Sequence, residues 1–599
     1  MDDLFAYIKN HRTDIIHEFG SPLEYCKALA SNNGMTALPH STQDAFRNAK
    51  PDDRDYAIST AYALLLGAEQ RKALAAYFTP PGLASAVLDA ASGFIDGVEL
   101  PAVLDPACGG GSFLTPLARH LIDIRLQRGE EVQDACRSVL KQVQGIELDA
   151  GLANLSQMLL RRMLVREYGF ARRGPLGVVK QGDALSVSIH RKFDLVIGNP
   201  PYGKVRGRLE DSLLMASGRA NVGGHTNIYS LFMLRGLNWV KPRGGLVFVL
   251  PTSFVAGPYF AGLRHEVFSR AFVERIDLHE QRENLFLGAV QDICLLVLRR
   301  REEGDERKIE RSHSYELGYI NTEGVRNPRG TGLARSDGEP WTLPVARKVH
   351  FSTNSTAPWR DELEKTFTLS EYGYRVRVGK VVPTRERERL NTSRKKGDVP
   401  LLWASSIRPD GSFDFEAARR LENALRYSPP AKGGVAYAST QPAVIVQRTS
   451  NRDQARRLNA AVVPKQFRDQ HVNGFVAENH VIVIEATPGD PALPPETLVK
   501  MLNATVTNER FSAVSGSFSV SARLLQRLAL PDPIKVKMLN PEDFENGLRK
   551  LFDSLGDILV YAKMSDASGN LKDAVNKSRD LDRGSTVYDN PRLKRSAIA

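Results

Sequence analysis

The sequence predicts an α/β protein built on a mostly parallel sheet with helices on both faces. Short apolar runs alternate with stretches of helical periodicity, such as residues 114–128 and 152–168, between about residues 77 and 300. The runs expected to be strands are residues 102–104, 143–146, 195–197, 246–250 and 293–298. Such alternation is typical of parallel strands connected through helices. A glycine-rich turn after the first of these strands agrees with this class, because many α/β proteins bind a ligand there.

The remaining chain divides into segments of different character. Residues 1–70 have helical periodicity and carry no evident chemical motif, and residues 301–369 combine a mixed charge run with a glycine and proline cluster. Short β-rich runs separated by turns follow. We therefore expect a helical N-terminal extension at 1–70, the α/β domain at 71–300, a linker with edge elements at 301–369, a mixed α+β domain at 370–535, and a helix with a polar tail at 536–599.

The chain is basic, with 599 residues and a formal net charge of +12. A positive balance of this size fits a polyanionic partner such as a nucleic acid. The N-terminus lacks the plan of a signal peptide and the apolar runs are too short to span a bilayer, so we expect a cytoplasmic protein with no membrane partner. No metal site or disulfide framework is predicted, because no CxxC pair occurs among the four cysteines Cys26, Cys108, Cys136 and Cys294.

A glycine-rich turn follows the first expected strand. Residues 103–114 read Val-Leu-Asp-Pro-Ala-Cys-Gly-Gly-Gly-Ser-Phe-Leu, with Asp105, Ala107 and Gly109 at the turn. Glycine has no Cβ atom, so a ligand can approach the backbone closely. Taken alone, the run is compatible with a tight turn or with a nucleotide site, although its spacing is not the Gly-x-Gly-x-x-Gly of dinucleotide-binding proteins.

Two acidic residues follow the glycine-rich turn in the sequence. Glu147 ends the second expected strand, where a carboxylate can accept hydrogen bonds from both hydroxyls of a ribose. Asp183 comes after the next short apolar run, another position at which a carboxylate can accept hydrogen bonds from a ligand. Surface carboxylates are common, so neither residue identifies a site without its neighbours.

A rigid tetrapeptide, Asn199-Pro200-Pro201-Tyr202, follows the strand expected at residues 195–197. Two consecutive prolines fix the backbone and remove two N–H donors, so the carbonyl oxygens can face a ligand. The side-chain oxygen of Asn199 and the carbonyl oxygen of Pro200 can accept both protons of an amino group. This would make the lone pair of a ring-conjugated nitrogen available as a nucleophile. The alternative is a structural turn stiffened by proline.

These motifs together resemble those of N6-adenine-specific DNA methyltransferases of the gamma class, of restriction-modification type. Residues 105–113 are similar to the Asp-Pro-Ala-Cys-Gly-x-Gly-x-Phe loop of Rossmann-like methyltransferases, and Phe78-Thr79-Pro80-Pro81 resembles the segment before that loop. The resemblance implies S-adenosylmethionine as cofactor and methyl transfer to N6 of an adenine. The cofactor-binding residues that it implies are Thr79, Asp105, Ala107, Gly109, Glu147, Asp183 and Asn199.

The resemblance also implies roles around the target base, which must be flipped out of the duplex at a cost of a few kcal/mol. Asn199 and Pro200 would accept the protons of the adenine amine. Tyr202 would stack on the base and return about 1–3 kcal/mol. A second aromatic residue, Phe286, would lie on the other face of the base.

The tetrapeptide alone does not choose the substrate. It also occurs in enzymes that methylate a glutamine amide in release factors and in guanine-N2 rRNA methyltransferases. Three features favour duplex DNA: the segment around Thr79, the existence of a domain after residue 370, and the many basic residues of that domain. Segments 446–454 and 476–480 resemble parts of DNA target-recognition domains. The expected DNA-binding residues are Arg448, Asn451, Arg452 and Asn479.

We therefore expect a site-specific adenine DNA methyltransferase whose target-recognition domain is residues 370–535. The N-terminal extension is too short for a nuclease domain, so we expect no fused nuclease, and a separately encoded restriction endonuclease is a plausible partner. Two alternatives are an RNA or protein N-methyltransferase and a DNA-binding defence subunit without activity. The intact cofactor and catalytic motifs argue against an inactive subunit.

Overall fold

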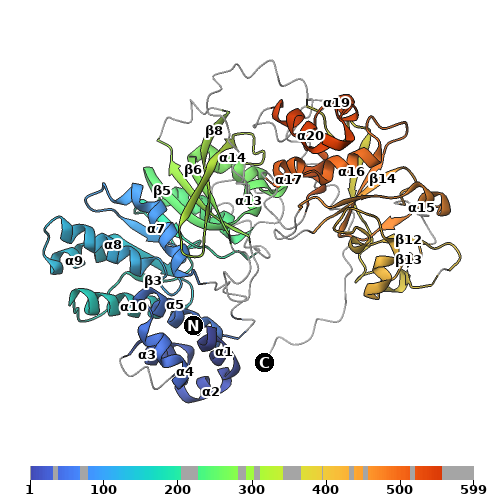
Figure 1. The fold of residues 1–599 in the computed structure, drawn as a ribbon. Helices are drawn as coiled ribbons and strands as arrows, with labels where there is room; N and C mark the ends of the chain where they lie inside the picture. The colour runs from blue at the N-terminus through green and yellow to red at the C-terminus, as the bar shows by residue number, and fades with distance from the viewer. Residues whose placement is uncertain are drawn as a thin grey trace, which may run out of the picture.

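The computed structural model describes residues 2–31, 38–67, 70, 78–203, 227–280, 292–302, 311–341, 366–393, 395–430, 438–449, 456–512 and 520–555. They form an N-terminal helical region, a central domain around a large sheet, and a second domain of helices and smaller sheets (Figure 1). Within these ranges, no helix has both the length and the apolar character that crossing a membrane requires.

Five helices make up the described N-terminal region: α1 (Asp2–Asn10), α2 (Arg12–Phe19), α3 (Pro22–Ala30), α4 (His40–Asn48) and α5 (Pro51–Leu65). Residues 57–65 of α5 are all buried. The helix is covered on several sides because its apolar residues share one cluster with residues of α1, α3 and α10 (Ala150–Tyr168). The N-terminal region therefore packs directly on the central domain (Figure 1).

The central domain contains a nine-stranded sheet of order β3-β2-β1-β4-β5-β7-β6-β8-β9. The strands are β1 (Val103–Asp105), β2 (Val143–Glu147), β3 (Val179–Gln181), β4 (Phe193–Gly198), β5 (Val240–Pro251), β6 (Ala271–His279), β7 (Ile293–Arg300), β8 (Ser312–Ile320) and β9 (Arg326–Arg335). From β3 to β5 all neighbours pair in parallel. β7 lies antiparallel between β5 and β6.

Helices cover both faces of this sheet. The helices are α7 (Pro81–Ile95), α8 (Leu114–Gln127), α9 (Val132–Gln142) and α10 on one face, and α12 (Ile228–Trp239), α13 (Ser253–Ala256) and α14 (Ala261–Arg270) on the other. Alternate residues of β5 serve the two layers: Val247 and Val249 pack with α7 and α8, whereas Leu246 and Phe248 pack with α12 and α14. The predicted α/β, Rossmann-like fold is confirmed, and each of the five expected strands is present.

The sequence did not single out β6, because charged residues interrupt its apolar pattern. Asp277 in this strand is fully buried, with ion pairs to Arg275 at 2.6 Å and to Arg326 at 3.0 Å. A buried charge is tolerated when it is paired and hydrogen-bonded. The strand is thus held by an ion-pair network that a hydrophobicity pattern does not reveal.

The segment expected to hold a linker with edge elements contributes two strands, β8 and β9. β8 pairs in parallel with β6, and β9 pairs antiparallel with β8 despite its glycine and proline cluster. A Cβ atom added at Gly332 would lie 2.7 Å from a ring carbon of Tyr315, so glycine leaves room for this cross-strand ring. The turn after β8 also packs on α7, because a Cβ atom at Gly82 would lie 2.1 Å from the carbonyl oxygen of Thr322.

The second domain is of mixed α+β type, with two four-stranded sheets of orders β10-β17-β14-β15 and β11-β13-β12-β16. Its strands are β10 (Tyr374–Val378), β11 (Leu390–Asn391), β12 (Val399–Leu402), β13 (Arg426–Tyr427), β14 (Ala443–Gln447), β15 (Ala460–Val462), β16 (Val476–Ala477) and β17 (Val481–Ala486). Its helices are α15 (Lys465–Gln470), α16 (Pro495–Asn503), α17 (Thr505–Ser512), α18 (Ala522–Gln526), α19 (Pro533–Lys537) and α20 (Phe544–Asp553).

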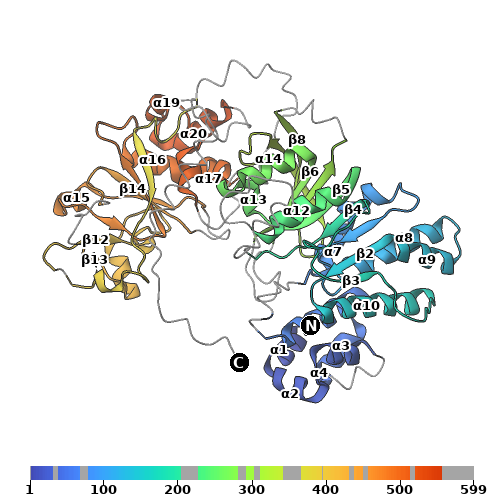
Figure 2. The ribbon, with the colours of Figure 1, turned by 180° about the vertical axis from the view of Figure 1, so that it is seen from behind.

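Both views show the second domain beside the central domain, with α17 facing α13 (Figures 1 and 2). An ion pair between Arg527 and Glu339, at 2.9 Å, connects the two domains. Both side chains are largely buried, at 16% and 29% exposed. The second domain is therefore held on the side of the sheet that carries β6 to β9.

Candidate active site

The carboxyl ends of β1, β2 and β4 meet at one edge of the sheet, because these strands are parallel neighbours. Asp105 at the end of β1 pairs in register with Gly145 of β2, two residues before Glu147. β4 lies on the other side of β1 and leads into Asn199. The topology thus gathers the glycine-rich loop, an acidic residue and the proline tetrapeptide at this edge, where ligands of open α/β sheets bind.

The glycine-rich loop has a conformation that requires its glycines. Gly109 and Gly111 have φ angles of +53° and +88°, in the left-handed region that glycine adopts readily. Gly110 faces α5, where a Cβ atom would lie 2.3 Å from the Ser59 Oγ atom. The amide of Cys108 donates to the Ile146 carbonyl oxygen at 3.0 Å, which ties the loop to β2.

Asp105 is fully buried beneath this loop. Its Oδ1 atom accepts a hydrogen bond from the Ala107 amide at 3.1 Å, and its Oδ2 atom has no hydrogen-bond partner among the described residues. Burial raises the pKa of Asp105 to about 8. A buried carboxyl group with an unused oxygen fits a ligand that carries hydrogen-bond donors or positive charge, and S-adenosylmethionine carries both.

The two other acidic residues are oriented by backbone amides. Glu147 accepts hydrogen bonds from the Gly109 amide at 2.8 Å and from the Asp149 amide at 2.9 Å, one on each oxygen. Each oxygen keeps a further lone pair for a ribose hydroxyl. Asp183 accepts from the Leu185 amide at 2.9 Å and from the Ser186 hydroxyl at 2.7 Å. The residues present therefore fit the nucleoside part of S-adenosylmethionine.

The tetrapeptide is linked to the segment that precedes α7. The Asn199 Nδ2 atom donates a hydrogen bond to the Thr79 Oγ1 atom at 3.2 Å. The Tyr202 hydroxyl donates to the Asn199 Oδ1 atom at 2.5 Å. Burial raises the pKa of Tyr202 well above 10, so this hydroxyl keeps its proton. The Asn199 amide is thus held at both ends, with its oxygen directed at the tyrosine.

The Tyr202 ring packs between the two core layers of the sheet and meets the ring of Tyr229 edge to face, with centroids 6.4 Å apart. A second expected aromatic residue, Phe286, lies outside the described residues, so its predicted role stays a prediction.

The expected DNA-binding residues are only partly within the described chain. Arg448 and Asn479 lie together where β14 and β17 end and begin, and the Arg448 guanidinium donates to the Asn479 carbonyl oxygen at 2.8 Å. Arg448 therefore also holds the turn before β17. Asn451 and Arg452 lie outside the described residues.

Sequence reasoning missed the contribution of α5 to this site. The Tyr62 hydroxyl donates to Asp149 Oδ1 at 2.7 Å, and Asp149 in turn positions Glu147 through its amide. A Cβ atom at Gly151 would lie 2.0 Å from the Tyr62 hydroxyl oxygen, which shows how closely α5 approaches. The available signal in the sequence was the polar pair Ser59 and Thr60 within the mostly apolar second half of this helix, residues 57–65.

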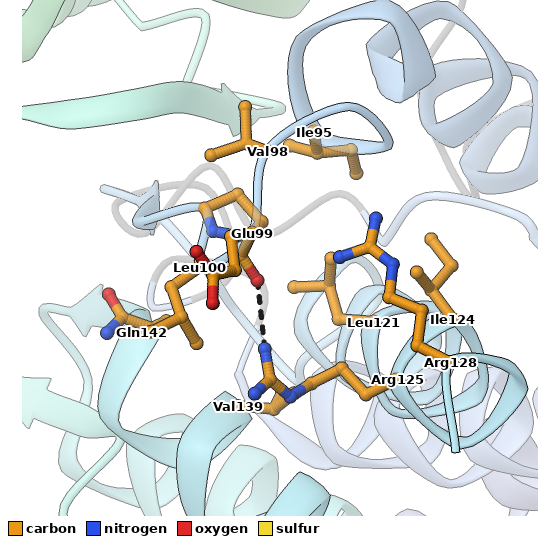
Figure 3. A pocket seen from close by; sticks show the side chains of 11 residues that line it. Ile95, Val98, Glu99, Leu100, Leu121, Ile124, Arg125, Arg128, Val139 and Gln142 are labelled. Atoms are coloured by element: carbon orange, nitrogen blue, oxygen red, sulfur yellow. Dashed lines mark hydrogen bonds between the residues drawn. The ribbon is translucent and has the colours of Figure 1, made fainter. Parts of the chain in front are cut away.

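A separate small cavity lies at the opposite edge of the sheet, near the start of β1 (Figure 3). Its volume is about 10 Å³, room for roughly one water molecule. Arg125 lies across it and donates to the Glu99 carbonyl oxygen at 2.9 Å (Figure 3). Its size and its distance from the carboxyl strand ends exclude it as the cofactor site. Among the described residues, no group of three or more His, Cys, Asp or Glu side chains is arranged to hold a metal ion.

Comparison with known proteins identifies relatives of the chain. Residues 170–286, which include the tetrapeptide, match the family described as Eco57I restriction-modification methylase. The type II methyltransferase M.BsuBI of Bacillus subtilis is 23% identical over 389 residues, which cover 64% of this chain and 73% of that protein. M.PstI of Providencia stuartii is 22% identical over 346 residues, covering 57% and 65%.

A solved structure also resembles the chain over most of its length. It is a nuclease-deletion mutant of the type ISP restriction-modification enzyme LlaGI in complex with a DNA substrate mimic. The two chains share 11% sequence identity and a TM-score of 0.45, and the match covers 92% of this chain and 63% of the other.

Proposed function

We propose that this chain, a DNA methyltransferase with an Eco57I restriction-modification methylase domain, methylates the N6 nitrogen of adenine in duplex DNA. The methyl donor is S-adenosylmethionine, which supplies an activated methyl group on a sulfonium. The single observation that carries the assignment of an amino nitrogen as methyl acceptor is the Asn199 amide, whose Nδ2 atom donates to Thr79 so that its oxygen points away from Thr79, toward Tyr202. The choice of adenine in duplex DNA rests on the whole set of motifs and on the restriction-modification methyltransferases that the chain resembles.

Asn199 and Pro200 would act as acceptors for the target amine. Two acceptors aimed at the amine protons favour a tetrahedral nitrogen whose lone pair is available for attack. An adenine amine would replace the Tyr202 hydroxyl as the donor to Asn199 Oδ1. No strong base is needed in the described site, because the sulfonium would leave as a neutral thioether, which is a good leaving group. Orientation of the amine toward the methyl group would supply much of the rate enhancement.

Tyr202 would have a second role after the base enters. Its ring lies beside the acceptor oxygen, and its hydroxyl releases Asn199 when the amine arrives. Stacking of the flipped base on this ring would contribute about 1–3 kcal/mol toward the cost of base flipping. Phe286 is our proposal for the opposite face of the base.

Cofactor binding in this proposal uses residues around the glycine-rich loop. Glu147 would bind the ribose hydroxyls, and Asp183 would accept from the adenine amine of the cofactor. Thr79, Asp105, Ala107 and Gly109 would line the methionine part. The Oδ2 atom of Asp105, which has no hydrogen-bond partner among the described residues, supports this arrangement.

Residues 370–535 of the second domain, the boundaries expected from the sequence, are our proposal for DNA target recognition. Its basic residues suit phosphate contacts, and Arg448 and Asn479 lie on neighbouring strand ends. Arginine and asparagine side chains can read guanine and adenine edges in the major groove. A cytoplasmic location in a prokaryotic cell and a separately encoded restriction endonuclease belong to the same proposal.

An Asn199→Ala variant tests the catalytic assignment. It removes one acceptor without changing the backbone, so transfer of labelled methyl groups to duplex DNA should fall at least a hundredfold. DNA binding, measured by a mobility shift, should stay within a few fold of the wild type. Undiminished methylation by this variant would refute the role of the tetrapeptide.

A further inference from the structure

A cavity of about 100 Å³ lies beside the glycine-rich loop. Its wall combines parts of the chain that are far apart in the sequence: α5, the segment with Thr79, the first half of α7, and residues 110–116 at the start of α8. Thr79 connects it to the tetrapeptide, because its hydroxyl accepts from Asn199. The cavity is therefore next to the proposed catalytic residues, with α5 as its outer wall.

One buried hydroxyl group in this wall makes no hydrogen bond to the described residues. Thr115, in the first turn of α8, is 3% exposed, and its Oγ1 atom has no hydrogen-bond partner among the described residues. Buried hydroxyls normally have a partner, so an unpartnered hydroxyl at a cavity wall indicates a polar ligand. The N-terminal end of the 14-residue helix α8 also favours a negatively charged group.

A carboxylate lines the same cavity from the side of α5. Asp55 forms an ion pair with Arg162 at 3.0 Å, and its side chain is 18% exposed. Burial raises the pKa of Asp55 to about 6 although Arg162 lowers it, so a further cation beside this carboxylate would stabilise its charged form. Asp52, the other acidic residue of the wall, is 46% exposed and paired with Arg119 at 2.8 Å. Asp55, the more buried of the two carboxylates, is therefore the residue that we expect to contact a cationic ligand.

We propose that α5 completes the cofactor site, with Asp55 binding the α-ammonium group of S-adenosylmethionine and the Thr115 hydroxyl binding its α-carboxylate. The two ends of the amino acid part carry opposite charges, and the cavity offers a carboxylate on α5 and a hydroxyl at a helix N-terminus. The inference rests on the proposed function for the cofactor alone and is independent of the methyl acceptor. The N-terminal helical region would therefore be part of the enzyme's cofactor machinery.

Binding of ligands with and without the amino acid part to the 599-residue chain tests this assignment without any turnover. S-adenosylhomocysteine keeps the amino acid part, whereas 5′-methylthioadenosine lacks it. In calorimetry, Asp55→Asn should raise the Kd for S-adenosylhomocysteine at least fivefold. The Kd for 5′-methylthioadenosine should stay within twofold of the wild-type value. Asp53→Asn is the matched control, because it removes the same charge from the same helix turn but does not line the cavity.

A second variant separates the two contacts. Thr115→Val should raise the Kd for S-adenosylhomocysteine at least threefold. The Kd for decarboxylated S-adenosylmethionine, which has the ammonium group but no carboxylate, should stay within twofold of the wild-type value. Unchanged S-adenosylhomocysteine binding by Asp55→Asn, or equal weakening of both ligands, would overturn the proposal. If the wild type bound none of these ligands, the proposed cofactor itself would be refuted instead, so the two failures are distinguishable.

Discussion

Replacing Thr79 by valine removes the acceptor that orients the Asn199 amide while nearly preserving the shape of the side chain. The Asn199 Nδ2 atom donates to Thr79 Oγ1 at 3.2 Å, and Thr79 is only 4% exposed, so the valine variant leaves this amide group without its protein partner. Loss of one partner of a buried hydrogen bond costs about 1–3 kcal/mol. The amide can then also rotate and present its nitrogen, instead of its oxygen, to the substrate amine.

This free-energy cost should raise the barrier of the methyl-transfer step and so lower kcat. A loss of about 1–3 kcal/mol of transition-state stabilisation corresponds to a decrease in kcat of roughly 5–160-fold. The assay is steady-state methylation of duplex DNA at saturating S-adenosylmethionine, together with direct measurement of cofactor affinity. Thr79→Ser keeps the hydroxyl and should retain a kcat within threefold of the wild type.

Two results would refute this reasoning. One is a Thr79→Val enzyme with the kcat of the wild type, which would mean that Tyr202 alone orients the amide. The other is an effect confined to the KM for S-adenosylmethionine, which would make Thr79 a cofactor contact without influence on Asn199.

Three further predictions concern the same site. Gly110→Ala places a Cβ atom 2.3 Å from Ser59 Oγ and should lower the free energy of unfolding by about 1–3 kcal/mol. Adding Ser59→Gly should restore part of this stability in thermal denaturation. A double variant no more stable than Gly110→Ala would contradict the contact. Burial raises the pKa of Asp105 to about 8 from about 4 in an unfolded chain, so folding binds a proton in this window and stability falls as pH rises, by up to about 1.4 kcal/mol per pH unit. Urea denaturation between pH 6 and 8 should therefore show a steeper loss for the wild type than for Asp105→Asn, and equal slopes would contradict the raised pKa. Tyr202→Phe keeps the ring and should retain kcat/KM within about threefold, whereas Tyr202→Ala should lose roughly tenfold through lost stacking; equal losses in methylation assays would exclude stacking on this ring.

The sequence predicted those parts of the site that are determined locally. The loop from Asp105 to Ser112 and the tetrapeptide from Asn199 each follow a strand. Glycine gives the loop its conformational freedom, and proline restricts the backbone of the tetrapeptide. Their conformations follow from neighbours in the sequence, and the parallel order of the strands brings them together. The same local logic predicted the five apolar strands.

The parts that sequence reasoning missed depend on packing between distant segments. Ser59 and Tyr62 reach the cofactor edge only because α5 packs on α10, and no spacing in residues 1–70 indicates this. β6 was hidden by Asp277, whose buried charge is paired with Arg326 from β9 as well as with Arg275. Both cases involve polar residues whose partners lie dozens of positions away.

Identification of the methylated nucleoside is the most direct test of the central claim. Duplex DNA of mixed sequence would be incubated with the purified chain and isotopically labelled S-adenosylmethionine, digested to nucleosides and analysed by mass spectrometry. We expect the label in N6-methyldeoxyadenosine, and we expect it to be lost with Asn199→Ala. Label in N4-methyldeoxycytidine, or label transferred only to RNA or protein, would contradict it.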